Sequence, residues 1–165
     1  MEKITPCLIT ERLILEGVTE EDTGLIVAWR SNPEVYPFFL SPHPLSQGEH
    51  LDWFRNSYVQ DKNRFDWVAE MKDGKKAVGL FGIKRENEDS KEAEISYLLA
   101  PEAQGKGYAG EAVKCIMKVA AKRWFCDSCI AVIHADNHAS VEFAKRLGFT
   151  ASDAEGVFVH YKREL

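Results

Sequence analysis

The chain has 165 residues, of which 45% are hydrophobic and 28% charged, and this is the composition of an ordinary globular protein with a single domain over residues 1–165. Its net charge of −5 argues against nucleic acid as a partner, because non-specific nucleic-acid affinity depends on clustered Lys and Arg. We expect a cytoplasmic protein without a membrane partner, because no apolar run approaches the roughly 18 residues of a membrane span and the start of the chain lacks a signal-peptide core.

One strand and two helices are predicted in the first third of the chain. Alternating apolar and polar residues indicate the strand. The first helix begins with a threonine and three acidic residues, which favour the positive end of a helix dipole, and it ends at an Asn-Pro pair. The second helix begins with the Ser-x-x-Glu pattern of a capping box. The boundaries are residues 10–15 for the strand, Thr19 to Pro33 for the first helix and Ser46 to Val59 for the second.

Aromatic side chains are concentrated in the same part of the chain. Nine of the 18 aromatic residues lie between Trp29 and Trp67. Packing in the core would explain this concentration. Alternatively, some of these side chains, together with His43 and His50, line a pocket for an acceptor molecule, since binding sites consist mostly of apolar walls with a few polar groups.

The rest of the chain alternates between strands and helices. Two strands are joined at Asp73-Gly74, a dipeptide typical of hairpin turns. An apolar run indicates a buried strand, and apolar residues at helical spacing then indicate a long helix from Ala109 to Trp124. A short helix and further strands close the chain. The predicted strands are residues 65–71, 77–85, 93–99, 128–134, 150 onward and 157–163, and the short helix is residues 139–147.

A glycine-rich segment between the buried strand and the long helix carries the main functional signal. Glycines allow a sharp turn and let a ligand approach the main chain closely. The first N–H groups of a helix have no carbonyl partner and lie at the positive end of its dipole. The segment therefore predicts an anion site, and phosphate is the anion that such sites commonly bind. Its sequence is Gln104-Gly105-Lys106-Gly107-Tyr108-Ala109-Gly110.

Two phosphate-binding patterns fit this segment. Gly105, Gly107 and Gly110 spell the G-x-G-x-x-G of dinucleotide-binding folds, with Asp127 further along the chain. Too few residues follow for the several βαβ units of such a fold. The second pattern, Q-x-x-G-x-A from Gln104, resembles the pyrophosphate loop of the GNAT superfamily of N-acetyltransferases, which use acetyl-coenzyme A.

A second match to this superfamily lies downstream. Residues 137–149, N-H-A-S-V-E-F-A-K-R-L-G-F, are similar to the N-x-x-S/A and K/R-x-G-F segment that follows the fifth strand in GNAT proteins. The resemblance implies a mixed α/β (α+β) domain with a central, mostly antiparallel, twisted sheet of six to seven strands and about four flanking helices. It also implies that the fourth and fifth strands splay apart and that acetyl-CoA is a co-substrate. Residues 10–15 resemble the opening of the branch that contains ribosomal-protein and amino-sugar acetyltransferases.

The resemblance also implies roles for individual residues. Because an amine with a pKa near 10 is mostly protonated at neutral pH, a base must accept its proton. Glu94, in the pattern A-E-I-x-Y, is the candidate base, with His134 as second choice, although both residues also fit ordinary strand positions. A main-chain N–H of the splayed fourth strand, within Tyr97, Leu98 and Leu99, is expected to hold the thioester carbonyl. Residues 104–110 are expected to hold the pyrophosphate.

The group that protonates the leaving thiolate is not identified by the resemblance. Many superfamily members have a tyrosine seven residues after the asparagine, but this chain has Ala144. Ser140 matches a serine that lies near the sulfur in the ribosomal-protein branch, and it fits equally well as a helix cap. Asn137 is expected to contact the pantetheine arm. Cys126 and Cys129 form a C-x-x-C without a second ligand pair and lie outside the motifs, so we predict no metal site and direct transfer without a covalent enzyme intermediate.

The acceptor is predicted to be a primary amine. Residues 32–54 look like the corresponding part of acetyltransferases that act on nucleotide-linked amino sugars, which favours such a sugar or another small amine. A protein N-terminus, as in ribosomal-protein acetyltransferases, is one alternative. A non-catalytic domain that senses acyl-CoA is another, because the tyrosine is absent. The sequence is compatible with a monomer and with a homodimer.

Overall fold

The structure, a computed structural model, describes residues 3–165. Within them, eight strands form one sheet in the order β1-β2-β3-β4-β5-β6-β8-β7, and every neighbouring pair is antiparallel except β5 and β6. The strands are β1 Leu8–Ile9, β2 Leu13–Gly17, β3 Arg64–Met71, β4 Ala77–Lys84, β5 Glu92–Leu99, β6 Ser128–His134, β7 Thr150–Glu155 and β8 Phe158–Glu164. The helices are α1 Thr23–Arg30, α2 Gln47–Asn56, α3 Tyr108–Arg123 and α4 His138–Arg146.

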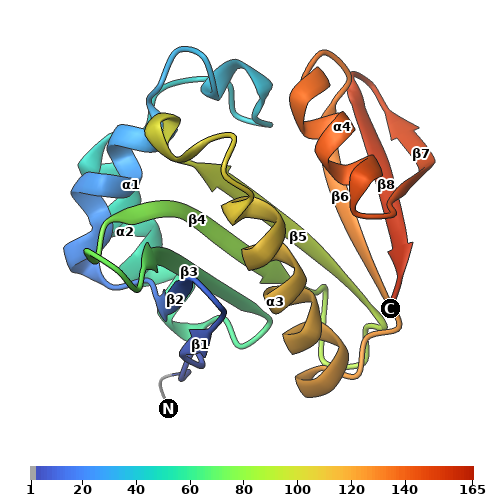
Figure 1. The fold of residues 1–165 in the computed structure, drawn as a ribbon, viewed down its shortest axis with the longest axis horizontal. Helices are drawn as coiled ribbons and strands as arrows, with labels where there is room; N and C mark the ends of the chain where they lie inside the picture. Colours follow the sequence, from blue (N-terminus) through green and yellow to red (C-terminus); the bar gives the residue numbers. More distant parts are fainter. Residues whose placement is uncertain (1–2) are drawn as a thin grey trace.

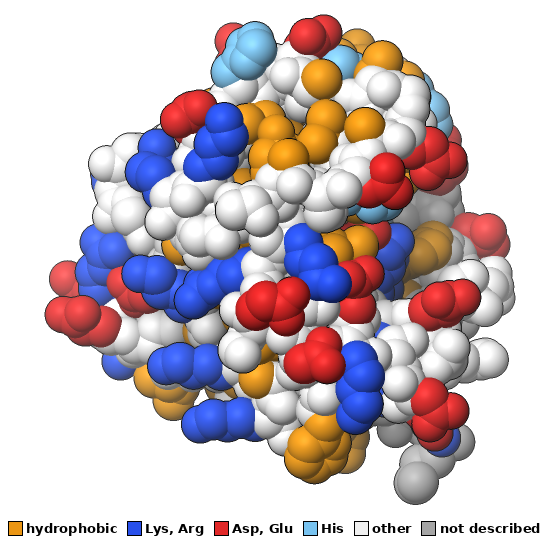
Figure 2. Space-filling view, turned by 90° about the vertical axis from the view of Figure 1, so that its right-hand side faces the viewer, with side chains coloured by type: hydrophobic (Ala, Val, Ile, Leu, Met, Phe, Trp, Pro, Cys, Tyr) orange, Lys and Arg blue, Asp and Glu red, His pale blue; other side chains and the backbone are white. Residues whose placement is uncertain are grey.

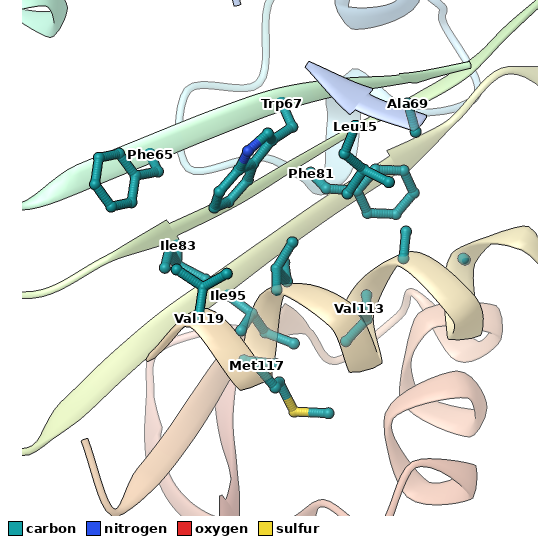
Figure 3. Close-up of a cluster of buried hydrophobic side chains, with 14 of the residues drawn as sticks. Leu15, Phe65, Trp67, Ala69, Phe81, Ile83, Ile95, Val113, Met117 and Val119 are labelled. Atoms are coloured by element: carbon teal, nitrogen blue, oxygen red, sulfur yellow. The ribbon is translucent and has the colours of Figure 1, made fainter. Parts of the chain in front are cut away.

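Helix α3 covers one face of the sheet and lies in front of β4 and β5 in Figure 1. Large side chains from several strands gather against it, as Figure 3 shows for Leu15, Trp67 and Phe81. Trp67 and Phe81 face each other across β3 and β4, and neither is accessible to solvent. Burying such side chains is the main favourable term in folding. The packing of these side chains against α3 therefore fixes the position of this helix, whose N-terminus carries the glycine-rich segment.

The opposite face of β3 is covered by α2 and the turn that follows it. Arg64 packs 4.9 Å from the centre of the Trp53 ring, and the main-chain N–H of Asp66 donates to the Tyr58 hydroxyl at 2.8 Å. The buried Asp66 carboxylate accepts a hydrogen bond from Arg64 at 2.9 Å and lies directly against Gly82 of β4. Burial raises the pKa of Asp66, and the charge of Arg64 opposes that shift. This face therefore contains buried charge, whereas the α3 face is apolar.

Strands β5 and β6 pair over only three residues, Glu92–Glu94 with Ser128–Ile130. Beyond this point the two strands diverge, and Figure 1 shows β5 continuing beneath α3 while β6 stays with α4. The gap between the diverging strands lies at their carboxyl ends. Main-chain groups that border such a gap have no partner in the sheet and are available to a ligand.

The predicted fold class is confirmed, including the splayed strands and the four helices. The sheet has one strand more than the six to seven expected, because the two-residue strand β1 pairs with β2. Helix α2 ends at Asn56 and not at Val59, since Tyr58–Gln60 forms a separate 3-10 turn. Ser46 caps α2, accepting the N–H of Glu49 at 3.1 Å, but within residues 3–165 no hydrogen bond from the Ser46 N–H to the Glu49 side chain completes the predicted capping box. In the part of the chain described, no helix combines the length and the apolar content that a membrane span requires.

Candidate functional site

Six consecutive main-chain N–H groups, from Gly105 to Gly110, donate no hydrogen bond to any group within residues 3–165. Gly105 and Gly107 have φ angles of +76° and +81°, a conformation that costs other residues about 1–2 kcal/mol. Gly107 is also the N-cap of the 16-residue helix α3, so the loop lies at the positive end of a helix dipole. Unpaired N–H groups in this arrangement can bind the oxygens of a phosphate or diphosphate.

Arg12 holds this loop in place, a role that the sequence did not reveal. Its guanidinium donates to the carbonyl of Lys106 at 2.9 Å and to the carboxylate of Glu111 at 2.8 Å, and it lies 4.5 Å from the centre of the Tyr108 ring. The same carboxylate accepts hydrogen bonds from the main-chain N–H of Arg12 and the hydroxyl of Thr10. Arg12 and Glu111 are 99 positions apart, so no local pattern predicts their contact.

An open groove of about 610 Å³ runs beside the first turns of α3. Gly107 and Gly110 border it at the loop, and Lys114 and Lys118 border it further along the helix. These lysines place positive charge next to the loop in a chain with a net charge of −5. Glu11 and Glu111 also border the groove, so an anionic ligand would depend on the main-chain N–H groups and the helix dipole more than on the net charge of the groove.

The main-chain N–H groups of Tyr97 and Leu99 point into the gap beside β5. Ala100 donates its N–H to the carbonyl of Val78 in β4 at 2.9 Å, and successive peptide groups along a strand point to opposite sides. The register between β4 and β5 is continuous, so the N–H of Leu98 also faces β4. Of the three N–H groups expected to hold a carbonyl, those of Tyr97 and Leu99 thus border the gap, and that of Leu98 does not.

The side chain of Tyr97 crosses the gap to α4. Its hydroxyl lies 2.6 Å from Oγ of Ser140, and its ring packs edge-on against Phe143 with 4.8 Å between ring centres. Burial raises the pKa of Tyr97, so the phenol is neutral at physiological pH. The cap of α4 is Asn137, whose Oδ1 accepts the N–H of Ser140 at 3.3 Å. The Ser140 side chain therefore does not cap the helix and faces β5 instead.

Glu94 lies on the other side of β5. Because side chains alternate along a strand, Glu94 faces the α1–α2 side while Tyr97 faces α3 and α4. The carboxylate of Glu94 is 30% exposed and pairs with Lys84, directly across on β4, at 3.3 Å. Ser96, two residues further along on the same side, is exposed. A ligand on this side would reach Glu94 without crossing the core.

The histidines considered from the sequence have different surroundings. His134 accepts the N–H of Asp136 on Nδ1 at 3.1 Å, so in the neutral ring Nε2 carries the proton. His50 is buried, with Nδ1 3.1 Å from the Thr23 hydroxyl, and joins α2 to α1. His50 therefore does not line a pocket. His43 is exposed on the α1–α2 connection.

An aromatic and cationic group, which we call the Arg30 cluster, lies on the same side as Glu94. Phe38 contacts the ring of His134 in β6, and His134 contacts Phe158 in β8, with 5.5 and 5.4 Å between ring centres. The half-buried Arg30 lies 5.0 Å from the centre of the Phe39 ring and forms no ion pair or hydrogen bond within residues 3–165. Burial and the nearby Arg64 lower the pKa of Arg30, and the charge of Asp66 opposes that shift. The cluster consists of Arg30, Phe38, Phe39, His134 and Phe158.

The face of the molecule that carries β7 has side chains of both charges. Figure 2 looks onto the side of the molecule that carries β7 and shows acidic and basic side chains interspersed there, with hydrophobic side chains gathered in the upper part. This face lacks the continuous basic area that nucleic acid requires. Over residues 3–165, no group of three or more His, Cys, Asp or Glu side chains is arranged to hold a metal ion.

Comparison with known proteins gives consistent matches over most of the chain. A family model described as an acetyltransferase (GNAT) domain matches residues 12–150. The uncharacterized N-acetyltransferase YoaA of Bacillus subtilis is 28% identical over 94% of this chain and 88% of its own length. The spermidine N(1)-acetyltransferase of Escherichia coli is 25% identical over 88% of this chain and 75% of its own length.

Similarity to solved structures extends across the whole fold. FdhC, a nucleotide-linked sugar GNAT, superimposes with a TM-score of 0.81 over 98% of this chain and 91% of that protein. The two sequences are only 15% identical, so this likeness concerns the fold.

Proposed function

We propose an acceptor and a mechanism for this chain, which belongs to the GNAT acetyltransferase family and so moves acetyl groups from acetyl-CoA to amines. The acceptor that we propose is a small primary amine that also carries negative charge, such as a nucleotide-linked amino sugar. Transfer is direct, within a ternary complex of enzyme, acetyl-CoA and amine. The observation that supports the use of acetyl-CoA is the run of six unpaired N–H groups from Gly105 to Gly110.

On the cofactor side, these N–H groups bind the diphosphate of acetyl-CoA, and Gln104, Lys106, Tyr108 and Ala109 belong to the same loop. The loop needs no rearrangement to do so, because Arg12 already holds it in shape. Asn137 retains its side-chain NH₂ for the pantetheine arm while its oxygen caps α4. Pre-organised donors of this kind bind an anion without a cost for ordering the loop.

In the gap, the N–H groups of Tyr97 and Leu99 polarise the thioester carbonyl and stabilise the oxyanion that forms on it. Glu94 accepts the proton of the amine from the opposite side of β5. Ser140 faces the departing sulfur from α4. The amine thus enters on one side of β5 and the thiol leaves on the other. This arrangement is compatible with a ternary complex and requires no nucleophile from the enzyme.

The proposed acceptor class rests on Arg30. A half-buried guanidinium that makes no ion pair or hydrogen bond within residues 3–165 is costly, and an anionic ligand would add to the partial compensation that the charge of Asp66 gives. Phe38 and Phe39 add flat apolar surface on which a nucleotide base could stack. A polyamine such as spermidine would instead bring further positive charge toward Arg30 and Lys84. This argument favours a nucleotide-linked sugar over a polyamine, and it disfavours a basic peptide for the same reason.

Turnover assays test this proposal. Release of free thiol from acetyl-CoA would be followed with a nucleotide-linked amino sugar, the same amino sugar without the nucleotide, spermidine and an N-terminal peptide. We expect the nucleotide-linked sugar to have the highest kcat/KM, and Arg30→Met to reduce that preference about 10- to 100-fold, as loss of a hydrogen bond to a charged group would. Preference for spermidine or the peptide would refute the acceptor. Binding of CoA without turnover of any amine would instead indicate a sensor domain.

A further inference from the structure

We propose that Tyr97 positions Ser140 to donate a hydrogen bond to the sulfur of the leaving thiolate. A phenol from strand β5 would then serve in place of the tyrosine that α4 lacks at Ala144. The inference rests on the proposed acetyl-CoA site. It assigns Ser140 a contact with the reacting atoms and Tyr97 a positioning role that acts through Ser140.

The geometry of the pair supports this role. The Tyr97 hydroxyl is 2.6 Å from Oγ of Ser140 and 3.4 Å from the Ser140 carbonyl oxygen. Within residues 3–165, the Ser140 hydroxyl has no other hydrogen-bond partner. When the phenol donates to Oγ, the serine proton remains available to a third group. Phe143 packs edge-on against the Tyr97 ring and restricts its rotation.

The pair also lies where the sulfur would have to be. Tyr97 follows the point at which β5 and β6 diverge, and Ser140 is in the first turn of α4 on the far side of the gap. A thioester carbonyl held by the N–H of Tyr97 or Leu99 lies beside this strand, and its sulfur is bonded to the same carbon. Ala144 is 2% exposed and has no polar group, so α4 offers no hydroxyl from that position.

Acetyl transfer from the thioester to the amine does not require a proton from the Tyr97 phenol. The amine nitrogen bonds to the carbonyl carbon and gives its proton to Glu94, the C–S bond breaks, and the electron pair stays on sulfur. The Ser140 hydroxyl donates to that sulfur while the phenol donates to Ser140. Because burial raises the pKa of Tyr97, the phenol keeps its proton. The thiolate takes a proton from water after release, because the pKa of a free thiol is about 8.5.

The variants Tyr97→Phe and Ser140→Ala test the inference through kcat. We expect each to lower kcat about 10- to 100-fold, the typical effect of losing a hydrogen bond to a charged group. Because Tyr97 acts through Ser140, the double variant should be hardly slower than Ser140→Ala alone. Tyr161→Phe is the matched control, since the side chain of Tyr161 in β8 is largely buried but its hydroxyl makes no hydrogen bond within residues 3–165. Multiplicative effects in the double variant would overturn the coupling.

Binding of CoA and of desulfo-CoA, which lacks the sulfur, separates this role from a structural one. A donor aimed at the sulfur favours its thiolate form, so wild-type affinity for CoA relative to desulfo-CoA should rise between about pH 6.5 and about pH 9. In Tyr97→Phe and in Ser140→Ala this rise should be lost while desulfo-CoA still binds. An unchanged rise together with an unchanged kcat would overturn the role of the pair. Failure of the wild type to bind either compound would instead overturn the cofactor site itself.

Discussion

The two sides of strand β5 differ in the kind of groups that they present. On the proposed cofactor side, the glycine-rich loop presents main-chain N–H groups at the start of a helix. On the proposed acceptor side, the available groups are side chains from α1, the α1–α2 connection, β5 and β6, among them Arg30, Phe38 and Glu94. The cofactor side is therefore determined by backbone conformation, whereas the acceptor side depends on side chains that distant parts of the chain bring together.

Main-chain groups and side chains respond differently to amino-acid substitution, so the two sides of β5 can change independently. Main-chain donors are present whatever the neighbouring side chains are, so a diphosphate site persists as long as the glycines keep their positive φ angles and Arg12 holds the loop. A site made from side chains changes with every substitution. One family can therefore keep acetyl-CoA as donor and vary the amine. Predictions that affect one side and spare the other test this division.

Replacing Glu94 by Gln should have the largest effect and should be limited to the acceptor side. A general base contributes about 10²- to 10⁴-fold to the rate, so kcat should fall by that factor, most strongly at acidic to neutral pH. Affinity for acetyl-CoA should stay unchanged in calorimetry. Glu92→Gln is the matched control, because Glu92 lies two residues earlier on the same side and pairs with Lys162 at 3.5 Å. A pH–rate profile equal to that of the wild type would remove Glu94 from the base role.

Replacing Gly107 by Val should affect the cofactor side alone. The added Cβ would lie 3.3 Å from Nη2 of Arg12, and the φ of +81° is unfavourable for valine, so we expect the loop to shift and CoA affinity to fall about 100-fold. Gly74→Val is the control, because Gly74 has the same φ of +81° in the turn after β3 and nothing within 4 Å of its Cβ. Equal CoA affinity in the two variants would contradict the loop assignment.

The same division explains what the sequence could predict. The glycine-rich segment, the strand before it and the helix after it are contiguous, so one stretch of chain indicated both the loop and its ligand. The strands and helices were recognised from their periodicity and capping residues, such as Ser46. The contacts of Arg12 with Glu111 and of Tyr97 with Ser140 join residues 99 and 43 positions apart, and no local pattern encodes them. The assignment of roles to Glu94 and Ser140 still awaits experiment.

Replacing Gly82 by Ala should destabilise the fold on the acceptor side of the sheet. A Cβ at this position would overlap with Oδ1 of Asp66 and approach Oγ of Ser96 to 2.8 Å. The buried carboxylate would have to move away from Arg64, and overpacking of this kind typically costs about 1–3 kcal/mol. Urea denaturation measures the loss. Gly24→Ala, with open space around its Cβ in α1, should instead be neutral or slightly stabilising. Equal stability of the two variants would contradict the close contact at Gly82.

The smallest effect is expected from the pH dependence of His50. Burial lowers the pKa of His50 below its ordinary value of 6.5, so the folded state favours the neutral ring. Stability is complete above about pH 6.5 and is lost as the pH falls toward the folded pKa, because the unfolded chain binds the proton more tightly. The titration of one group can change the free energy of unfolding by at most about 1.4 kcal/mol per pH unit.

The variant His50→Asn tests this pH dependence. It keeps a polar partner for Thr23 and removes the titration, so the free energy of unfolding should depend less on pH between about pH 5 and about pH 7. The exposed His43, replaced by Asn, is the control and should leave the dependence unchanged. If His50→Asn and the wild type lose stability equally on acidification, His50 does not account for the effect.

The central claim is that the N–H groups of Gly105–Gly110 bind the diphosphate of coenzyme A. Amide chemical shifts in ¹⁵N-labelled protein test it directly, with CoA as ligand and pantetheine, which has no diphosphate, as control. We predict that CoA shifts the amide signals of Gly105, Gly107 and Gly110 while pantetheine leaves them in place. Saturating CoA that shifts other amides and leaves these three unchanged would contradict the account.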